Sequence, residues 1–457
     1  MTRGGSVGLT VGGTPLAPGP GTVHRGDGLG PIRCCVWGYL LSWLLVGALR
    51  KWAFPALASP LGFLQELFVG AAYLLAFRAR IFPRSLLIWA AGLICIGVCL
   101  LGVVGTELPP GVVAAGVWAY FWPIPFIYII ARVMRGADCL CVARFLMAFS
   151  MPMALLMTVQ FKSSPGSFIN AFVGADAVPQ RLIHEGWRVR PSGTFSYVGG
   201  ASWFWMAVFA VELAGVLKRG LVGWRLLAAA AAAAVLATAV CHSRTQIYGM
   251  VVVVLLVSPI AVRFASSGFG RVALALAAGS VLVGAASLVG VVQSGAETLA
   301  ARFESASKSE TLEGRLLYQA LPKGEAVENM PAGGYGLGVG TNTGALLLVG
   351  HRRFLLAEGE WPDVILQMGW GFGFLYLGVR FALGLAMCRV WFRALKLGDP
   401  LAVAWFAAGV VAVVAGQWET PSVQGCAILM AGLCLAHGAV LEEGLRIGPP
   451  TWARRVV

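Results

Sequence analysis

The stretch GHRRFLLAEGEWPDV concentrates ionisable side chains directly before a long apolar run. His351, Arg352 and Arg353 form its basic part, and Glu358 and Glu360 lie in its acidic part. Guanidinium groups bind phosphate through paired hydrogen bonds, and a carboxylate or an imidazole can accept a proton from a hydroxyl. The stretch therefore has the residue types for chemistry on a phosphorylated substrate. A solvated basic turn with acidic counter-ions would have the same composition.

Three further segments carry an arginine close to an apolar run. Arg190 lies in WRVRPSGTFSYVGG, Arg244 in the short turn CHSRTQ, and Arg315 in GRLLYQAL. An arginine is always charged. Near a membrane it therefore needs lipid headgroups, a carboxylate or a bound phosphate as its partner. Both a structural and a phosphate-binding role stay open for these arginines.

A glycine-rich stretch, GGYGLGVGTNTG, includes Gly336, Gly338 and Gly340. A nucleotide-binding loop would need a preceding strand in a βαβ unit, and neither is visible. Glycines that let the backbone approach a substrate or a helix closely explain the stretch better. Glu358-x-Glu360 could mimic the acidic pair of a metal-dependent glycosyltransferase, but no nucleotide-sugar domain accompanies it. No metal is expected.

These segments belong to a chain of 457 residues that is 58% hydrophobic and only 12% charged. A soluble domain carries about 25% charged residues, so the composition predicts an all-α polytopic membrane protein. About twelve apolar runs are long enough to cross a bilayer, which takes about 20 residues per helix. The expected spans are 35–49, 61–77, 86–104, 111–131, 139–159, 198–217, 221–241, 246–264, 271–293, 361–388, 399–416 and 422–440.

The basic residues predict how these spans are oriented. The connections on one side carry Arg or Lys at 78, 80, 84, 132, 135, 144, 218, 219, 225, 263, 271, 389, 393 and 396. The alternate connections GTELPPG and GQWETPS carry none, so the positive-inside rule predicts that both termini are cytoplasmic. Arg50 and Lys51 break this pattern. The net charge of +14 is spread over the connections and forms no basic face, which argues against nucleic-acid binding.

The expected organisation has five parts. They are a disordered cytoplasmic tail (1–33), transmembrane helices 1–9 with an outer loop at 160–197 (34–293), a large periplasmic loop (294–360), transmembrane helices 10–12 (361–441) and a cytoplasmic tail (442–457). Loops this long in a compact domain are usually functional. The chemistry is therefore expected on the outer face.

Several of these motifs together resemble the O-antigen ligase and O-antigen polymerase superfamily of bacterial inner-membrane enzymes. RPSGTFSYVGGASWF resembles the family's Arg-x-x-Gly-Thr-Phe entry into a span, and SRTQ resembles its Ser-Arg-Thr turn. GRLLYQAL followed by PAGGYGLGVGTNT is similar to its arginine helix and Gly-x-Gly-x-Gly loop. EWPDVILQMGWGFGFLYLG resembles the span that follows the catalytic loop. The resemblance covers residues 34–440.

The resemblance implies a GT-C-like fold and a metal-independent glycosyltransferase, without cofactors, in the bacterial inner membrane. The donor would be a glycan on undecaprenyl pyrophosphate, and the acceptor another glycan or a lipid A core. The product would be an O-antigen-like glycan, attached to lipopolysaccharide, or an exopolysaccharide. Arg190, Arg244 and Arg315 match the family's arginines, which hold the pyrophosphate, and Arg352 and Arg353 are expected to assist them.

The catalytic base is the position at which this chain departs from the family. The family usually has a His-Asn pair where this chain has Glu358 and Gly359, and His351 lies seven residues earlier. Either Glu358 is the base, or His351 reaches the site along another loop path. A carboxylate can serve if burial raises its pKa toward neutrality. The alternative function is a lipid-linked glycan flippase or polysaccharide transporter, and ligation and polymerisation both stay open.

Overall fold

The computed structural model describes residues 29–105, 108–173, 189–218, 220–241, 243–264, 321–322, 325–351 and 353–447. Its regular structure within these ranges is helical, without strands. The helices are α1 (Gly30–Ala48), α2 (Ala58–Leu61), α3 (Leu64–Arg78), α4 (Leu86–Gly105), α5 (Pro110–Tyr120), α6 (Ile124–Val133), α7 (Gly136–Lys162), α8 (Val198–Leu217), α9 (Trp224–Cys241), α10 (Arg244–Phe264), α14 (Glu325–Glu328), α15 (Asn342–Val349), α16 (Glu360–Leu397), α17 (Pro400–Ala415) and α18 (Pro421–Ile447). A π-helical turn, η2 (Leu49–Ala53), and two 3-10 turns, η3 (Pro55–Leu57) and η4 (Phe168–Asn170), complete them.

Nine helical segments of the described chain are long and apolar enough to cross a membrane. Two further apolar helices, at Leu86–Gly102 and Pro400–Ala415, are shorter. Eleven of the twelve expected spans coincide with described helices, and the remaining one, 271–293, lies outside the described residues. The protein is therefore an all-helical polytopic membrane protein.

Three expected segments differ in detail from the observed helices. α1 begins at Gly30, inside the expected N-terminal tail, and Pro31 is tolerated in its first turn because no helical hydrogen bond is lost there. The expected span 111–131 consists of two helices, α5 and α6, which separate just before Pro123 because proline has no N–H to continue the helix. α16 contains a break at Gly369.

The structure describes only part of the expected late loop. Within 294–360 it covers 321–322, 325–351 and 353–360, which contain α14, the glycine-rich stretch and α15. The expected loop 160–197 is described up to 173 and again from 189. The sides of the membrane on which these loops lie stay predictions.

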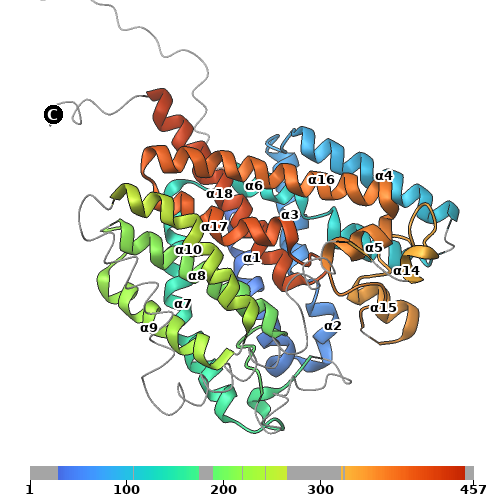
Figure 1. The fold of residues 1–457 in the computed structure, drawn as a ribbon, viewed down its shortest axis with the longest axis horizontal. Coiled ribbons are helices and arrows are strands. Elements are labelled where there is room, and N and C mark those ends of the chain that lie inside the picture. Colours follow the sequence, from blue (N-terminus) through green and yellow to red (C-terminus); the bar gives the residue numbers. More distant parts are fainter. Residues whose placement is uncertain are drawn as a thin grey trace, which may run out of the picture.

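α8, α17 and α18 form the centre of the helix bundle (Figure 1). α8 is apolar on all sides and is buried along most of its length, as expected for a helix without a polar face. α17 packs on α8, α10, α16 and α18, and its small residues permit close contact. A Cβ atom at Gly409 would lie 2.6 Å from the Cβ of Met430 in α18.

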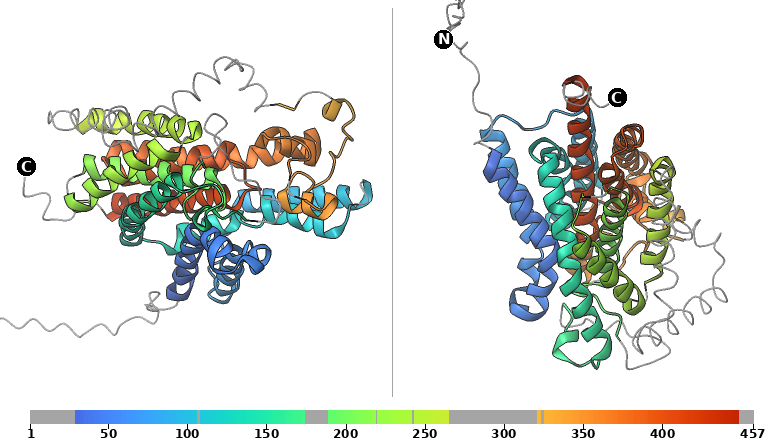
Figure 2. Two further views of the ribbon diagram at one scale, coloured as in Figure 1. Left: turned by 90° about the horizontal axis from the view of Figure 1, so that it is seen from below. Right: turned by 90° about the vertical axis from the view of Figure 1, so that its left-hand side faces the viewer.

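The remaining helices surround this centre. α1 packs along α3, and the pair forms one edge of the bundle (blue in Figure 2). α9 and α4 lie at opposite ends of the molecule in Figure 1, where α9 packs on α7 and α4 packs on α16. α4 keeps Trp89, Leu93 and Ile96 exposed. Such an apolar surface is suited to lipid rather than to water.

Candidate functional site

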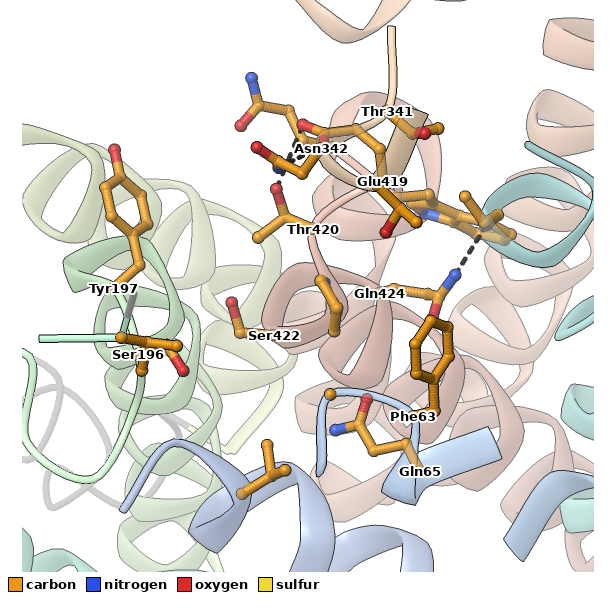
Figure 3. Close-up of a pocket in the computed structure, with 18 of the residues that line it drawn as sticks. Phe63, Gln65, Ser196, Tyr197, Thr341, Asn342, Glu419, Thr420, Ser422 and Gln424 are labelled. Atoms are coloured by element: carbon orange, nitrogen blue, oxygen red, sulfur yellow. Dashed lines mark hydrogen bonds between the residues drawn. The ribbon is translucent and has the colours of Figure 1, made fainter. Parts of the chain in front are cut away.

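A cavity of about 510 Å³ opens among the ends of α1, α3, α15 and α18 and the segment before α8. This volume falls within the roughly 300–1,000 Å³ of small-molecule sites. Its charged side chains are Arg50, Arg353, Glu66 and Glu419, and its amide side chains are Gln65, Asn342, Gln417 and Gln424. Figure 3 shows Asn342, Glu419 and Thr420 grouped on one side and Phe63 and Gln65 on the opposite side. The site is therefore a mixed polar and aromatic chamber built from segments far apart in the chain.

Glu419 lies in the turn between α17 and α18 and is 9% exposed. Asn342 donates to its Oε2 at 2.8 Å, and Thr420 donates to its Oε1 at 3.2 Å. Burial raises the pKa of the Glu419 carboxyl to about 8, and the nearby carboxyls of Asp363 and Glu360 add to this rise. The two hydrogen bonds oppose it. A carboxyl that titrates near neutrality can take up or release a proton under physiological conditions.

A buried ion pair between two parts of α16 holds this turn in place. The Arg380 guanidinium pairs with Glu360, and the two side chains are 1% and 2% exposed. Arg380 also donates to the carbonyl oxygens of Val413 at 2.7 Å and Gly416 at 2.6 Å, and it lies over the Trp418 ring at 4.7 Å. Two of the three Arg380 donors bind the end of α17, and the Trp418 N–H in the following turn donates to Glu360 at 3.3 Å. The network thereby fixes the position of Glu419, which follows Trp418 in the sequence and lines the cavity.

The opposite side of the cavity carries polar atoms without partners. Gln65 is 1% exposed, and neither atom of its amide has a hydrogen-bond partner among the described residues. Glu66 Oε2 is in the same situation. Buried polar groups in proteins are nearly always hydrogen-bonded, so these groups are available to a ligand in the cavity. Gln424 differs, because it donates at 2.6 Å to the Ala119 carbonyl.

The segment 189–197, which contains the RPSGTF motif, is held by a buried lysine. Lys51 is 3% exposed, and its Nζ donates to Ser192 Oγ at 3.2 Å and to the carbonyl oxygens of Gly193 at 2.6 Å and Phe195 at 2.8 Å. These bonds explain why a basic residue follows the first span, against the charge pattern of the other connections. They place the end of the motif against the cavity.

The glycine-rich stretch GGYGLGVG packs against the break in α16. Gly369 has φ +73° and ψ 168°, a conformation essentially restricted to glycine. At the break, Leu366 O accepts from the Tyr335 N–H at 2.7 Å, and Gln367 O accepts from the Gly336 N–H at 3.0 Å. The loop therefore supplies hydrogen bonds to a helix interruption.

Two more glycines of this stretch serve the same close packing. The Gly338 N–H donates to Gln367 Oε1 at 2.7 Å, and a Cβ at this position would overlap the Val112 carbonyl in α5. A Cβ at Gly340 would overlap the Asp363 carboxylate. Of the two alternatives that the sequence left open, contact with a helix is therefore the one observed. The loop glycines are not among the cavity-lining residues.

The arginines predicted to bind pyrophosphate occupy different places. Arg353 is exposed and lines the cavity. Arg190 and Arg244 are half-buried and do not line it, and the Nε of Arg190 has no hydrogen-bond partner in the described part of the chain. Arg315 and Arg352 lie outside the described residues. Of the three described arginines, Arg353 is the one at the cavity, and the binding roles of all five stay predictions.

The two predicted bases both lie outside the cavity. Glu358 and His351 are exposed and are not among the lining residues. His351 Nδ1 is 3.0 Å from the Val349 carbonyl oxygen, and the Glu358 carbonyl accepts a bond from Gln417. No contact of either side chain in the described structure reaches the cavity. Their catalytic roles stay predictions.

Glu419 and Gln65 were not among the site residues predicted from the sequence. A signal for Glu419 was present, since it is the only ionisable residue of the short connection GQWETPS between two apolar helices. A side chain there has little freedom to reach bulk water. Gln65 could not have been found, because an amide near a helix start carries no pattern of its own.

The arrangement can bind a ligand that combines anionic and hydroxyl groups. Arg50 and Arg353 supply positive charge, the carboxyls and amides can bond hydroxyls, and Phe63 and Trp118 form an aromatic wall with ring centroids 4.8 Å apart. No cluster of three or more His, Cys, Asp or Glu able to hold a metal occurs in the described ranges, and metal independence stays a prediction. No family model and no curated protein matches this chain.

Proposed function

We propose that this protein is a membrane glycosyltransferase that transfers a glycan from undecaprenyl pyrophosphate to another glycan or to a lipid A core. The reaction is a direct displacement at the anomeric carbon, with undecaprenyl pyrophosphate as the leaving group and without metal or cofactor. Positioning of the two substrates and electrostatic stabilisation of the leaving group supply most of the acceleration.

One observation carries this proposal: two motifs of the resemblance and the basic stretch His351-Arg352-Arg353 converge on one cavity. Ser196 and Tyr197 come from the RPSGTFSY motif, Thr341 and Asn342 follow the glycine-rich loop, and Arg353 follows His351-Arg352. An anionic donor and a hydroxyl-rich acceptor both find partners there. This supports a site at which a phosphate-linked sugar meets an acceptor.

The distribution of basic residues supports the placement of the cavity at the periplasmic face. The lining residues come from connections and helix ends that alternate with the arginine-rich connections, so the two sets belong to opposite ends of the spans. The positive-inside rule assigns the arginine-rich end to the cytoplasm. A lipid-linked donor would reach the cavity from the outer leaflet of the inner membrane.

The test uses the purified protein in liposomes that contain an undecaprenyl-pyrophosphate oligosaccharide, an acceptor and EDTA. Mass spectrometry follows free undecaprenyl pyrophosphate and the length of the glycan together. Release of the carrier with a longer or newly attached glycan is expected, and the product distinguishes polymerisation from ligation. Movement of intact donor between leaflets without release would contradict the proposal and favour a flippase.

Substitutions of single residues test which side chains bind the pyrophosphate of the donor. Arg353→Ala is expected to raise the KM for the donor by roughly 10-fold to 100-fold, since a charge-assisted hydrogen bond contributes about 1.5–3 kcal/mol. Arg393→Ala is the matched control, because Arg393 forms an exposed pair with Glu442 away from the cavity. The sequence further predicts that Arg190→Ala, Arg244→Ala and Glu358→Gln each abolish transfer while expression persists. Full activity in all three would remove them from the site.

A further inference from the structure

Among the described residues, the carboxyl of Glu419 forms no ion pair with a group of opposite charge. Its oxygens accept bonds from one amide and one hydroxyl, and the buried guanidinium of Arg380 is already paired with Glu360. A buried carboxyl without a cation weakens the fold. Glu419 lines the cavity together with Arg50 and Arg353, but no ion pair joins its carboxyl to a described side chain (Figure 3). The fold alone gives no reason for a carboxyl at this position.

We infer that Glu419 is the proton acceptor for the attacking hydroxyl of the acceptor sugar, and that Gln65 binds other hydroxyls of that sugar. This inference rests on the proposed glycosyl transfer. It assigns the interior of the cavity to a polyhydroxylated acceptor and leaves Arg353, at the exposed rim, to the phosphate of the donor.

The geometry of the cavity supports this division. Glu419 and Gln65 lie on opposite sides of the cavity in Figure 3, so a sugar between them can touch both. The Gln65 amide offers one donor and one acceptor group that no described residue uses, which matches the dual character of a hydroxyl. The neighbouring Phe63 and Trp118 rings provide an apolar wall for the C–H face of a sugar ring.

The chemical step balances with the groups at hand. The acceptor O–H gives its proton to the Glu419 carboxylate, and the acceptor oxygen forms a bond to the anomeric carbon of the donor. The bond between that carbon and the pyrophosphate oxygen breaks, and its electron pair leaves with undecaprenyl pyrophosphate. The added negative charge on the leaving group lies near Arg353, and the Glu419 proton then passes to water. The step neither consumes nor requires an oxidant, a reductant or a metal.

The charged groups around Glu419 determine its pH response. The carboxyls of Asp363 and Glu360 in α16 interact with it. Glu66, Arg50 and Arg353 line the same cavity. Since the pKa of Glu419 is raised to about 8, the ionised fraction grows as the pH rises from 6 to 8. The rate of transfer is expected to rise over the same range and to level off only about one pH unit above this pKa, where the carboxyl is almost fully ionised.

The decisive comparison is between Glu419→Gln and Glu358→Gln in the liposome assay, with Glu442→Gln as the control for an exposed carboxyl. Glu419→Gln keeps the size of the side chain and an oxygen for Asn342. It is expected to lower kcat at least 100-fold, the lower end of general-base catalysis, to leave the KM for the donor unchanged and to remove the rise toward pH 8. Glu442→Gln should match the wild type.

Two further variants cover the case in which Glu419→Gln does not fold. Glu419→Asp retains a carboxylate and is expected to keep part of the activity with an altered pH profile. Gln65→Leu is expected to raise the KM for the acceptor about 10-fold without changing that for the donor. If a folded Glu419→Gln or Glu419→Asp variant transferred the glycan at the wild-type rate and with the wild-type pH profile, the inference would be overturned. The proposed function would then remain intact. Absence of transfer in the wild type would overturn both.

Discussion

Replacing Arg380 with methionine should destabilise the protein more than any substitution of an exposed arginine. The Arg380 and Glu360 side chains are 1% and 2% exposed, so the substitution leaves a carboxylate buried without its cation. Removal of one partner from such a pair costs about 3–5 kcal/mol. It also removes the donors to Val413 O and Gly416 O. At about 2 °C per kcal/mol for a large chain, Tm should fall by roughly 6–10 °C.

Thermal unfolding in detergent, followed by tryptophan fluorescence, measures this loss. Arg393→Met is the matched control, since it removes the same side chain from an ion pair whose members are 45% and 47% exposed. An exposed pair contributes about 0–1 kcal/mol, so Tm should change by no more than about 2 °C. Equal shifts for the two variants would refute the reasoning.

A double-mutant cycle separates the ion pair from the packing of the arginine. Glu360→Gln combined with Arg380→Met removes the unpaired buried charge, so the double variant should be more stable than Arg380→Met alone. The coupling energy should lie toward the upper end of the roughly 0.5–3 kcal/mol seen for interacting residues. Strict additivity of the two single effects would show that the charges do not interact.

Three further predictions use the same unfolding assay together with hydrogen exchange. Gly369→Ala should cost at least about 1–3 kcal/mol because φ +73° and ψ 168° strain any other residue, whereas Gly378→Ala, with no atom within 4 Å of the new Cβ, should be neutral or stabilising. Lys51→Met removes three buried hydrogen bonds, of whose acceptors the Gly193 carbonyl keeps a bond from Gln160. It should lower the free energy of unfolding by about 1–3 kcal/mol and speed amide exchange in 189–197; unchanged exchange there would contradict the role of the lysine. Burial alone would raise the pKa of Asp399, but the hydrogen bond and the charge interaction with His437 lower this pKa overall. The stability that Asp399 provides is therefore fully present above its unfolded pKa of about 4. It is lost as the pH falls through the lowered pKa of the folded state. Asp399→Ala, which also removes the N-cap of α17, should lower Tm at pH 7 by the equivalent of about 0.5–2 kcal/mol and by progressively less as the pH falls toward the lowered pKa.

The helices of this protein are determined largely by local sequence. Long apolar runs must fold as helices in a bilayer, because each backbone polar group has to be bonded within its own segment. Eleven expected spans are therefore found as helices. The exceptions in detail follow local rules too, since Pro123 ends α5 and only glycine permits the conformation at Gly369.

The functional site depended on contacts between distant segments. Charge density drew attention to His351 and Glu358, yet both are exposed, because a charged side chain at a loop surface loses no hydration there. Glu419 became prominent only through burial and its neighbours Asp363 and Glu360. These neighbours are brought together by the packing of α16 against α17 and α18.

The sequence by itself determined that the chain is a helical membrane protein, where its helices run, and which segments carry phosphate-binding residue types. The tertiary structure decided which of those segments share a cavity, which basic residue is buried as a structural donor, as Lys51 is, and which carboxyl faces a ligand space. The physical reason is that hydropathy and backbone conformation act over neighbouring residues. Burial, pairing and pKa depend on which distant residues come into contact, and no local pattern in one sequence encodes that.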